Sequence, residues 1–275
     1  MATIRRVQDE LGFVLHRHDW SETSLILDVF SRLHGRVVLV AKGAKRPTSQ
    51  LRPVLLPLQP LLLSWSGDGE VRTLKTAQWR GGHVMPVGES LLAGIYLNEL
   101  LLRLLPRDDP HPVLFDAYLE AAAALAEAAL PAPPVLRAFE LMALREAGYL
   151  PDLSVEGHTH TPLNPEARYG LEPDHGLVLS TEPDRPALHA PQWLALQQSL
   201  DLAQPFMALV DGLTAPLCSA LQPVLRGLLQ RHCGVTGFKT RQLVREVQAM
   251  ARHTQSRHAH NPHIGYNQAV QEPAG

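Results

Sequence analysis

The chain has 275 residues, which is long enough for two domains and a sizeable core, and its hydrophobic content of 45% is ordinary for a soluble protein. Its 25 Lys and Arg residues nearly balance 27 Asp and Glu residues, so the total charge excludes no class of partner and local patches must be examined instead. The N-terminus lacks the apolar run of a signal peptide, and no apolar run reaches the roughly 18 residues that span a bilayer. We therefore expect a soluble intracellular protein.

Three short strands are predicted between residues 12 and 41. Apolar residues alternate over 14–16, 25–30 and 37–41, and turn residues separate these runs. Period-two alternation bounded by turn residues is the sequence signature of β-strands. The polar segment 20–24, which begins with Trp20, is expected to form a turn or a cap in which Ser and Thr hydroxyls bind backbone groups.

A basic loop follows the third predicted strand. Six Lys or Arg residues lie from Arg32 to Arg52, whereas no Asp or Glu lies between Asp28 and Asp68. A cationic loop on a small strand-rich module favours a polyanionic ligand. The alternative is a solvated surface loop without a ligand, which is the commoner role of such a loop.

Two further strands are predicted to complete a barrel. Two prolines favour an edge strand or a bend over residues 54–63, and the turn at 66–69 predicts a hairpin between strands 61–65 and 70–77. Five strands with almost no helical pattern between them predict a five-stranded OB-fold, a barrel that commonly binds single-stranded nucleic acid on its face and loops.

Leucine and alanine spacing predicts a mainly helical remainder, with proline and glycine residues at the ends of the helices. The predicted helices cover residues 89–105, 111–130, 135–147, 191–200, 213–232 and 240–251. The fold class is therefore α+β, with an N-terminal OB-fold barrel followed by an all-helical domain that carries a small irregular β-hairpin insertion. We place the barrel at 1–82, the helical domain at 83–150 and 191–252, the insertion at 151–190 and a disordered tail at 253–275.

Charged residues are distributed unevenly among these predicted domains. The insertion carries seven acidic residues against two basic ones, while the segment from Arg226 to Arg257 carries seven basic residues and the single acid Glu246. The chain thus has two cationic regions, the early loop and the C-terminal helices, around an acidic middle.

Metal and redox sites find little support in the sequence. Two cysteines, Cys218 and Cys233, match no zinc or redox spacing and are expected to be buried reduced thiols. Histidines of the insertion could supply zinc ligands, but no cysteine or acid pair completes a recognisable spacing. We therefore predict no metal and no cofactor. The histidines considered are His158, His160, His175 and His189.

Catalytic signatures are also missing. The sequence contains no phosphate-binding G-x-x-x-x-G-K-[ST] segment, no dinucleotide-binding G-x-G-x-x-G segment and no G-x-S-x-G nucleophile turn. Asp19, Glu22 and Asp28 near the first strands would suit a metal-dependent nuclease, but turn formation and surface solvation are the expected roles of these carboxylates.

Several segments in a fixed order resemble the RecO family of bacterial recombination mediators. They are SETSLILDVFSRLHGRVVLVAKGAKRP, LPLQPLLLSWSGDGEVRTL, YLNELLLRLLP, LRAFELMALREAGYLP and FKTRQLVRE, which span about residues 8–250. The resemblance implies an OB-fold and a helical domain, binding of single- and double-stranded DNA, and annealing of complementary strands without enzymatic activity. It also implies that the protein acts together with RecR and binds the C-terminal tail of the single-stranded DNA-binding protein SSB. During repair it would help RecA to replace SSB on DNA.

One departure from the family pattern concerns zinc. Many members carry a four-cysteine zinc site after the helix that ends in a GYLP-like sequence, whereas residues 152–179 contain no cysteine. The chain is similar to the members without that site, so the insertion is expected to be a remnant of the zinc module.

Two DNA-binding regions are predicted from the basic residues. Phosphate neutralisation by Lys and Arg makes such binding tolerant of sequence and sensitive to salt. The first region lies in and around the barrel loop, and the second lies near the C-terminus; two regions could hold two strands together during annealing. The predicted residues are Arg17, Arg36, Lys42, Lys45, Arg46, Arg52 and Lys75 in the first region, and Lys239, Arg241 and Arg245 in the second.

A binding site for the SSB tail is predicted in the helix LRAFELMAL, which resembles the family's tail pocket. Arg137 would hold the terminal carboxylate while apolar neighbours take the apolar last side chain. The alternative for Arg137 is a surface ion pair with Glu140 or Glu146. The apolar neighbours considered are Phe139, Leu141 and Leu144.

Two other functions are consistent with the sequence. One is a nucleic-acid enzyme with an N-terminal OB-fold, such as a metal-dependent nuclease. The other is a structural adaptor that binds protein but no DNA. The favoured function is a cytoplasmic, nucleoid-associated mediator that does not enter membranes. The oligomeric state, the RecR contact surface and the strand preference of each basic region are left open by the sequence.

Overall fold

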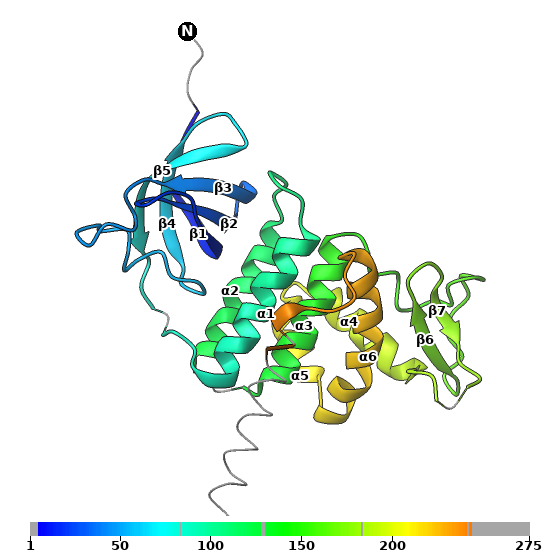
Figure 1. The fold of residues 1–275 in the computed structure, drawn as a ribbon. Helices are drawn as coiled ribbons and strands as arrows, with labels where there is room; N and C mark the ends of the chain where they lie inside the picture. Colours follow the sequence, from blue (N-terminus) through cyan, green and yellow to red (C-terminus); the bar gives the residue numbers. More distant parts are fainter. Residues whose placement is uncertain (1–4, 83, 128–129, 183, 241, 244–275) are drawn as a thin grey trace, which may run out of the picture.

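The computed structural model of the protein describes residues 5–82, 84–127, 130–182, 184–240 and 242–243. Five N-terminal strands form a closed barrel in the order β1-β2-β3-β5-β4 (Figure 1). The pair β3–β5 is parallel and the other neighbouring pairs are antiparallel. The predicted five-stranded OB-fold barrel is therefore confirmed. The strands are β1 (Arg6–Asp19), β2 (Leu25–Ser31), β3 (Gly35–Ala41), β4 (Leu61–Ser66) and β5 (Val71–Trp79).

Two of the strand predictions need correction. β1 begins at Arg6 rather than near Gly12, because its first half pairs with β4 across an irregularity that includes Asp9, a residue with a positive φ of 49°. Because of that irregularity, buried and exposed residues do not alternate regularly in the first half of β1, so the sequence pattern did not predict this part of the strand. The segment 42–60 is a loop, so of the two alternatives predicted before Leu61, an edge strand or a bend, the bend is the one observed; Pro57 and Pro60 have no N–H to donate to a strand ladder.

The remaining chain forms helices with a small second sheet. Figure 1 shows this sheet on the side of the helices that faces away from the barrel. It has three strands in the order β7-β6-β8, so the predicted hairpin gains a third strand. The elements are α1 (Gly88–Leu104), α2 (Pro112–Glu127), α3 (Ala132–Glu146), β6 (Arg168–Glu172), β7 (Gly176–Leu179), β8 (Leu188–His189), α4 (Ala190–Leu200), α5 (Pro205–Gly212) and α6 (Ala215–His232).

The helix predictions hold in general and fail in two places. The short helix α5 was not predicted, and the helix expected from residue 213 begins at Ala215. The predicted helix 240–251 and the tail 253–275 lie mostly or wholly outside the described residues. Among the described helices no single one is long and apolar enough to cross a membrane; α5 and α6 pass that length and composition test only as a pair bent by 116°.

Aromatic side chains join the barrel to the helices. Phe13 of β1 and Phe30 of β2 point out of the barrel, and both pack against Phe115 of α2 with ring centroids 5.6 and 5.2 Å apart. Tyr118, one turn further along α2, meets Phe13 edge-on at 4.8 Å. All four rings are fully buried. The junction is therefore a continuous apolar core that crosses from one domain to the other.

A buried polar chain lies beside these rings. The Asn98 side chain of α1 donates a hydrogen bond to the carbonyl of Leu15 (3.1 Å), and the Tyr118 hydroxyl donates one to the Asn98 side-chain oxygen (2.5 Å). Burial raises the pKa of Tyr118, so its hydroxyl keeps the proton that it donates. Buried polar groups must be paired in this way, so the chain fixes how the barrel sits on α1 and α2.

Replacing Tyr118 by Phe is expected to lower the free energy of unfolding by about 1–3 kcal/mol, because the Asn98 oxygen would be left buried without a donor. Urea unfolding followed by circular dichroism measures this change. The matched control is Tyr149→Phe, since Tyr149 is 38% exposed and its hydroxyl makes no hydrogen bond to the described residues; it should change stability by less than about 0.5 kcal/mol. Equal effects of the two substitutions would contradict the expectation that the buried hydrogen bonds from Tyr118 through Asn98 to Leu15 stabilise the fold.

Candidate nucleic-acid interface

The loop 42–60 brings together the exposed cations at one end of the barrel. Lys42, Arg46 and Arg52 are exposed, and none of them forms an ion pair or a side-chain hydrogen bond with the residues that the structure describes. The loop itself is fixed, because Ala44 and Leu55 are fully buried in the barrel core. Free positive charge on a fixed support is the arrangement that attracts phosphate groups.

Lys45 has a different role from its neighbours. Its backbone N–H donates to the carbonyl of Thr23 (2.9 Å), and its ammonium group donates to the carbonyl of Ser21 (3.1 Å) and pairs with Asp19 (3.2 Å). Lys45 therefore attaches the basic loop to the β1–β2 loop. Its charge is partly compensated by Asp19, so it differs from the unpaired cations with which the sequence had grouped it.

The β1–β2 loop presents an aromatic side chain that the sequence-based site did not include. Trp20 is 66% exposed. The loop closes on itself through bonds from the N–H groups of Trp20 and Ser21 to the carbonyl of Ser24, and the N–H of Gly43 donates to the Ser24 hydroxyl (3.4 Å). An exposed indole beside unpaired cations is a stacking platform of the kind found in single-strand binding sites. A tryptophan inside a polar turn was the signal that could have identified it.

Two more predicted residues lie at the same end of the barrel. Arg17 is exposed and donates one hydrogen bond to the carbonyl of Leu55 in the basic loop (3.1 Å), which leaves its other donors available. Lys75 is exposed at an irregularity of β5. The parallel register pairs Val40 with Thr73, so Lys42 and Lys75 each follow two residues later, at the same end.

Arg36 is not brought together with these cations. Its side chain is only 17% exposed and lies 3.6 Å from the Asp28 carboxylate, which also contacts His18 at 3.2 Å. Burial lowers the pKa of Arg36, although the nearby Asp28 charge opposes the shift. Arg36 lies close to the connector between α1 and α2, because its carbonyl accepts a hydrogen bond from the N–H of Asp108. Arg36 therefore lies against the connector of the helical domain, which could not be seen from its place in the basic segment of the sequence.

The second basic region is described only at its beginning. Lys239 is exposed, while Arg241 and Arg245 lie outside the described residues. The Glu99 carboxylate of α1 accepts hydrogen bonds from the N–H groups of Lys239 (3.0 Å) and Thr240 (2.9 Å) and from the Thr240 hydroxyl (2.8 Å). Glu99 therefore caps the segment from which the second region starts.

The residues predicted for the SSB tail are buried. Arg137 is 4% exposed, and its guanidinium donates to the Glu140 carboxylate (2.6 Å), which also accepts the Tyr96 hydroxyl (2.6 Å). The ion pair with Glu140 was one of the expected alternatives, but it lies inside the helical domain rather than on its surface. A peptide would have to displace this buried pair to reach Arg137, so the tail site at this set of residues stays a prediction. The apolar members, Phe139, Leu141 and Leu144, are fully buried in the helical core.

The insertion gathers histidines without forming a recognisable metal site. The rings of His158 and His175 lie 4.9 Å apart beside a cavity of about 410 Å³ that His160 and His232 also line. Among the residues that the structure describes, no three His, Cys, Asp or Glu side chains are placed to hold a metal ion together. His189 is exposed at the start of α4, where it forms the N-cap.

Comparison with known proteins agrees with this architecture. Residues 6–82 match the family model "Recombination protein O N terminal", and residues 86–242 match "Recombination protein O C terminal". The DNA repair protein RecO of Variovorax paradoxus is 54% identical over 259 residues, covering 91% of this chain and 100% of the relative. The RecO proteins of Albidiferax ferrireducens and a Polaromonas species are 51% and 53% identical, each with 91% of this chain and 100% of the relative covered. The chain belongs to the RecO family of DNA repair proteins.

Replacing Glu99 by Gln is expected to reduce stability in a pH-dependent manner. Burial alone would raise the pKa of Glu99, but the hydrogen bonds from Thr240, Lys239 and Arg103 outweigh burial, and the pKa lies below its ordinary value. The charged form is therefore favoured by folding. Its contribution is complete above the ordinary glutamate pKa of about 4.3 and is lost as the pH falls through the lowered pKa.

Thermal unfolding from about pH 3 to pH 7 measures this contribution as the difference between wild type and Glu99→Gln. The difference should be largest near neutral pH and shrink toward pH 3. Glu127→Gln is the control, because Glu127 is exposed and makes no side-chain contact with described residues. A difference that stays constant with pH would show that Glu99 does not act through its charge.

Proposed function

We propose that this RecO family member is a non-enzymatic DNA-binding mediator that uses the loop 42–60 and the β1–β2 loop as its primary DNA contact. The observation that carries the proposal is the group of exposed, unpaired Lys42, Arg46 and Arg52 beside the 66% exposed Trp20. The cations neutralise phosphates and the indole stacks on an unpaired base. Neither interaction reads base identity, so the contact tolerates any sequence.

The finer parts of the proposal follow from membership of the family. The protein would bind single- and double-stranded DNA, anneal complementary strands, and work with RecR and the SSB tail to help RecA onto SSB-coated DNA. Such work places it at the nucleoid. Lys239, Arg241 and Arg245 remain the proposed second DNA contact, and the RecR surface is not assigned to residues. The proposed SSB-tail site remains Arg137 with Phe139, Leu141 and Leu144.

The arrangement of carboxylates favours a mediator over a metal-dependent nuclease. Asp19 pairs with Lys45, whereas Asp28 is buried between His18 and Arg36. Glu22 is exposed in the β1–β2 loop. The three acids considered for nuclease chemistry thus have separate partners or none among the described residues, and they do not converge on one point.

A strand-annealing assay tests the function. Labelled complementary strands coated with SSB should anneal faster in the presence of the protein and stay intact when Mg²⁺ or Mn²⁺ is added.

The triple variant Lys42→Ala, Arg46→Ala, Arg52→Ala should bind single-stranded DNA more weakly, and the slope of log affinity against log salt should fall by about two, since each phosphate contact contributes about 0.7. Lys45 is left in place because it attaches the two loops.

A matched variant separates this site from general charge loss. Arg226→Ala removes an exposed cation of α6 that forms no ion pair or side-chain hydrogen bond with the described residues, and it should leave the salt slope unchanged. Cleavage of the labelled strand would favour the nuclease, and absence of DNA binding in dilute buffer would favour the adaptor. An unchanged salt slope in the triple variant would remove the loop from the site while leaving the family assignment intact.

Replacing Trp20 by Ala should weaken single-stranded DNA binding about 5- to 150-fold, because a stacked base contributes about 1–3 kcal/mol. Binding of duplex DNA should change much less, since its bases are already stacked on each other. Fluorescence anisotropy with labelled oligonucleotides measures both affinities. Tyr149→Ala is the control, because Tyr149 is an exposed aromatic residue (38%) that follows α3 in the helical domain. Equal losses for single strands and duplex would argue against stacking.

A further inference from the structure

A small cavity lies at the opposite end of the barrel from the basic loop. It is formed by the start of β1, the β2–β3 turn, the β4–β5 turn and the connector between α1 and α2. Its volume is about 160 Å³. Sites that enclose a drug-sized ligand occupy roughly 300–1,000 Å³, so this cavity suits one small chemical group rather than a whole nucleotide.

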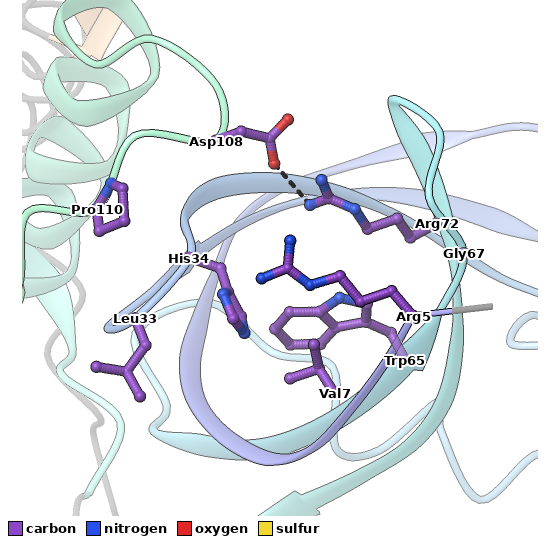
Figure 2. Close-up of a pocket in the computed structure, with 9 residues that line it drawn as sticks. All are labelled: Arg5, Val7, Leu33, His34, Trp65, Gly67, Arg72, Asp108 and Pro110. Carbon is purple, nitrogen blue, oxygen red and sulfur yellow. Dashed lines mark ion pairs between the residues drawn. The ribbon is translucent and has the colours of Figure 1, made fainter. Parts of the chain in front are cut away.

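Three nitrogen-bearing side chains from different elements line the cavity. Figure 2 shows the guanidinium groups of Arg5 and Arg72 extending into the same space, next to the Trp65 ring and with His34 at the side. Trp65 is 2% exposed and meets the His34 ring edge-on at 5.4 Å, so the indole forms an apolar floor that holds the imidazole in place. The donors therefore converge on one small space.

The two arginines are held in place by different neighbours. Arg72 is 17% exposed and pairs with Asp108 at 2.6 Å, a residue that adopts a positive φ of 59°. The backbone N–H of Arg5 donates to Asp68 (3.0 Å), which fixes the start of β1 beside Gly67 of the β4–β5 turn. The Arg5 guanidinium forms no ion pair or hydrogen bond with the residues that the structure describes. One guanidinium is thus oriented by a carboxylate and the other is open to a ligand.

The β2–β3 turn is fixed by a buried carboxylate. Glu10 is 7% exposed and accepts hydrogen bonds from the Ser31 hydroxyl (2.8 Å) and the N–H of Leu33 (2.7 Å). The Ser31 hydroxyl is also bonded by the N–H of His34 (3.3 Å). The position of His34 in the cavity is therefore determined by the barrel core and not by the ligand.

We propose that this cavity binds a phosphate-type oxyanion, and in particular the terminal phosphomonoester of a DNA strand. A phosphomonoester has three outer oxygens in a tetrahedral arrangement, and it can accept bonds from donors that approach from several directions. A carboxylate is planar and presents only two oxygens, and the one carboxylate that lines the cavity, Asp108, is already paired with Arg72. Two arginines against one lining carboxylate leave the cavity with an excess positive charge that a phosphate would compensate.

The assignment of the phosphate to a DNA end rests on the proposed DNA-binding function, whereas the oxyanion site itself does not. The Trp65 floor is almost wholly covered, so it cannot stack on a base, and the cavity would recognise the strand end by charge alone. This separates it from the contact around Trp20, which would recognise the interior of a strand. The same phosphate chemistry could also come from free inorganic phosphate, and the experiment below distinguishes the two sources.

The test compares two single-stranded oligonucleotides of one sequence, one with a 5′-phosphate and one with a 5′-hydroxyl. Wild-type protein should bind the phosphorylated strand about three- to tenfold more tightly. The preference should disappear in Arg5→Gln and in Arg72→Gln. Arg5→Gln is the decisive variant, because the Arg5 guanidinium forms no ion pair or hydrogen bond with the described residues, whereas Arg72→Gln also releases Asp108. Arg80→Gln, which removes an exposed barrel cation outside the cavity, should keep the preference.

A second measurement uses inorganic phosphate alone. Phosphate should raise the melting temperature of the wild type more than that of Arg5→Gln at equal ionic strength, because a ligand that binds only the folded state stabilises it. General salting-out by phosphate acts on both proteins and cancels in this comparison.

The two measurements separate the possible outcomes. A phosphate effect without a strand preference would support the oxyanion site and assign it to free phosphate. Equal affinity for both strands and equal stabilisation of both proteins would overturn the proposal, even if DNA binding at the basic loop were intact. Arg5-dependent binding of a peptide through its terminal carboxylate, without a response to phosphate, would also overturn it. If no oligonucleotide bound at all, the proposed function would fail, and the phosphate measurement would still decide the cavity.

Discussion

The contact of the barrel with α2 is the constraint on which the rest of the molecule depends. The outer face of β1 to β3 in an OB-fold is the surface that is commonly open to nucleic acid. Here Phe13 and Phe30 occupy part of that face and are buried against Phe115 and Tyr118. The helical domain therefore covers one end of the face, and the other end, with its loops, is left open.

The same packing decides which cations are free. Near the helices, Arg32 forms a two-pronged pair with Asp116 at 2.8 and 2.9 Å, Arg72 pairs with Asp108, and Arg36 lies against Asp28. Backbone contact is equally close there, since a side chain at Gly35 would place its Cβ 1.9 Å from the carbonyl oxygen of Asp109. At the far end the loop 42–60 contains no acid, because the sequence has none between Asp28 and Asp68, and among the described residues only Lys45 of its cations pairs with a carboxylate, that of Asp19. Positive charge therefore accumulates at the uncovered end as a consequence of how the domains pack.

These features explain what could and could not be predicted from the sequence. Alternating residues predicted β2 and β3, because a strand with one buried face must alternate, and the turn at 66–69 predicted the hairpin of β4 and β5. The eight residues of α5 are too few to show a helical period. Basic residues could be counted but not sorted into paired and free, since pairing depends on acids that are distant in the chain, as Arg72 and Asp108 show. For Arg137 the spacing offered Glu140 or Glu146 as a surface partner, but only the packing of the helices shows that the pair forms with Glu140 and is buried.

The positions of the two proposed contacts on the barrel imply different physical behaviour. The basic loop follows the end of β3, whereas His34 in the cavity precedes its start, so the seven residues of β3 separate His34 from Lys42 by roughly 23 Å at about 3.3 Å per residue. One phosphate cannot reach both, and a strand that used both would have to cross the barrel. The loop contact is exposed and is weakened steadily by salt. The cavity contact is partly enclosed and depends on whether a strand end carries the additional charge of a phosphomonoester. A protein built in this way would distinguish the end of a strand from its interior without reading a single base.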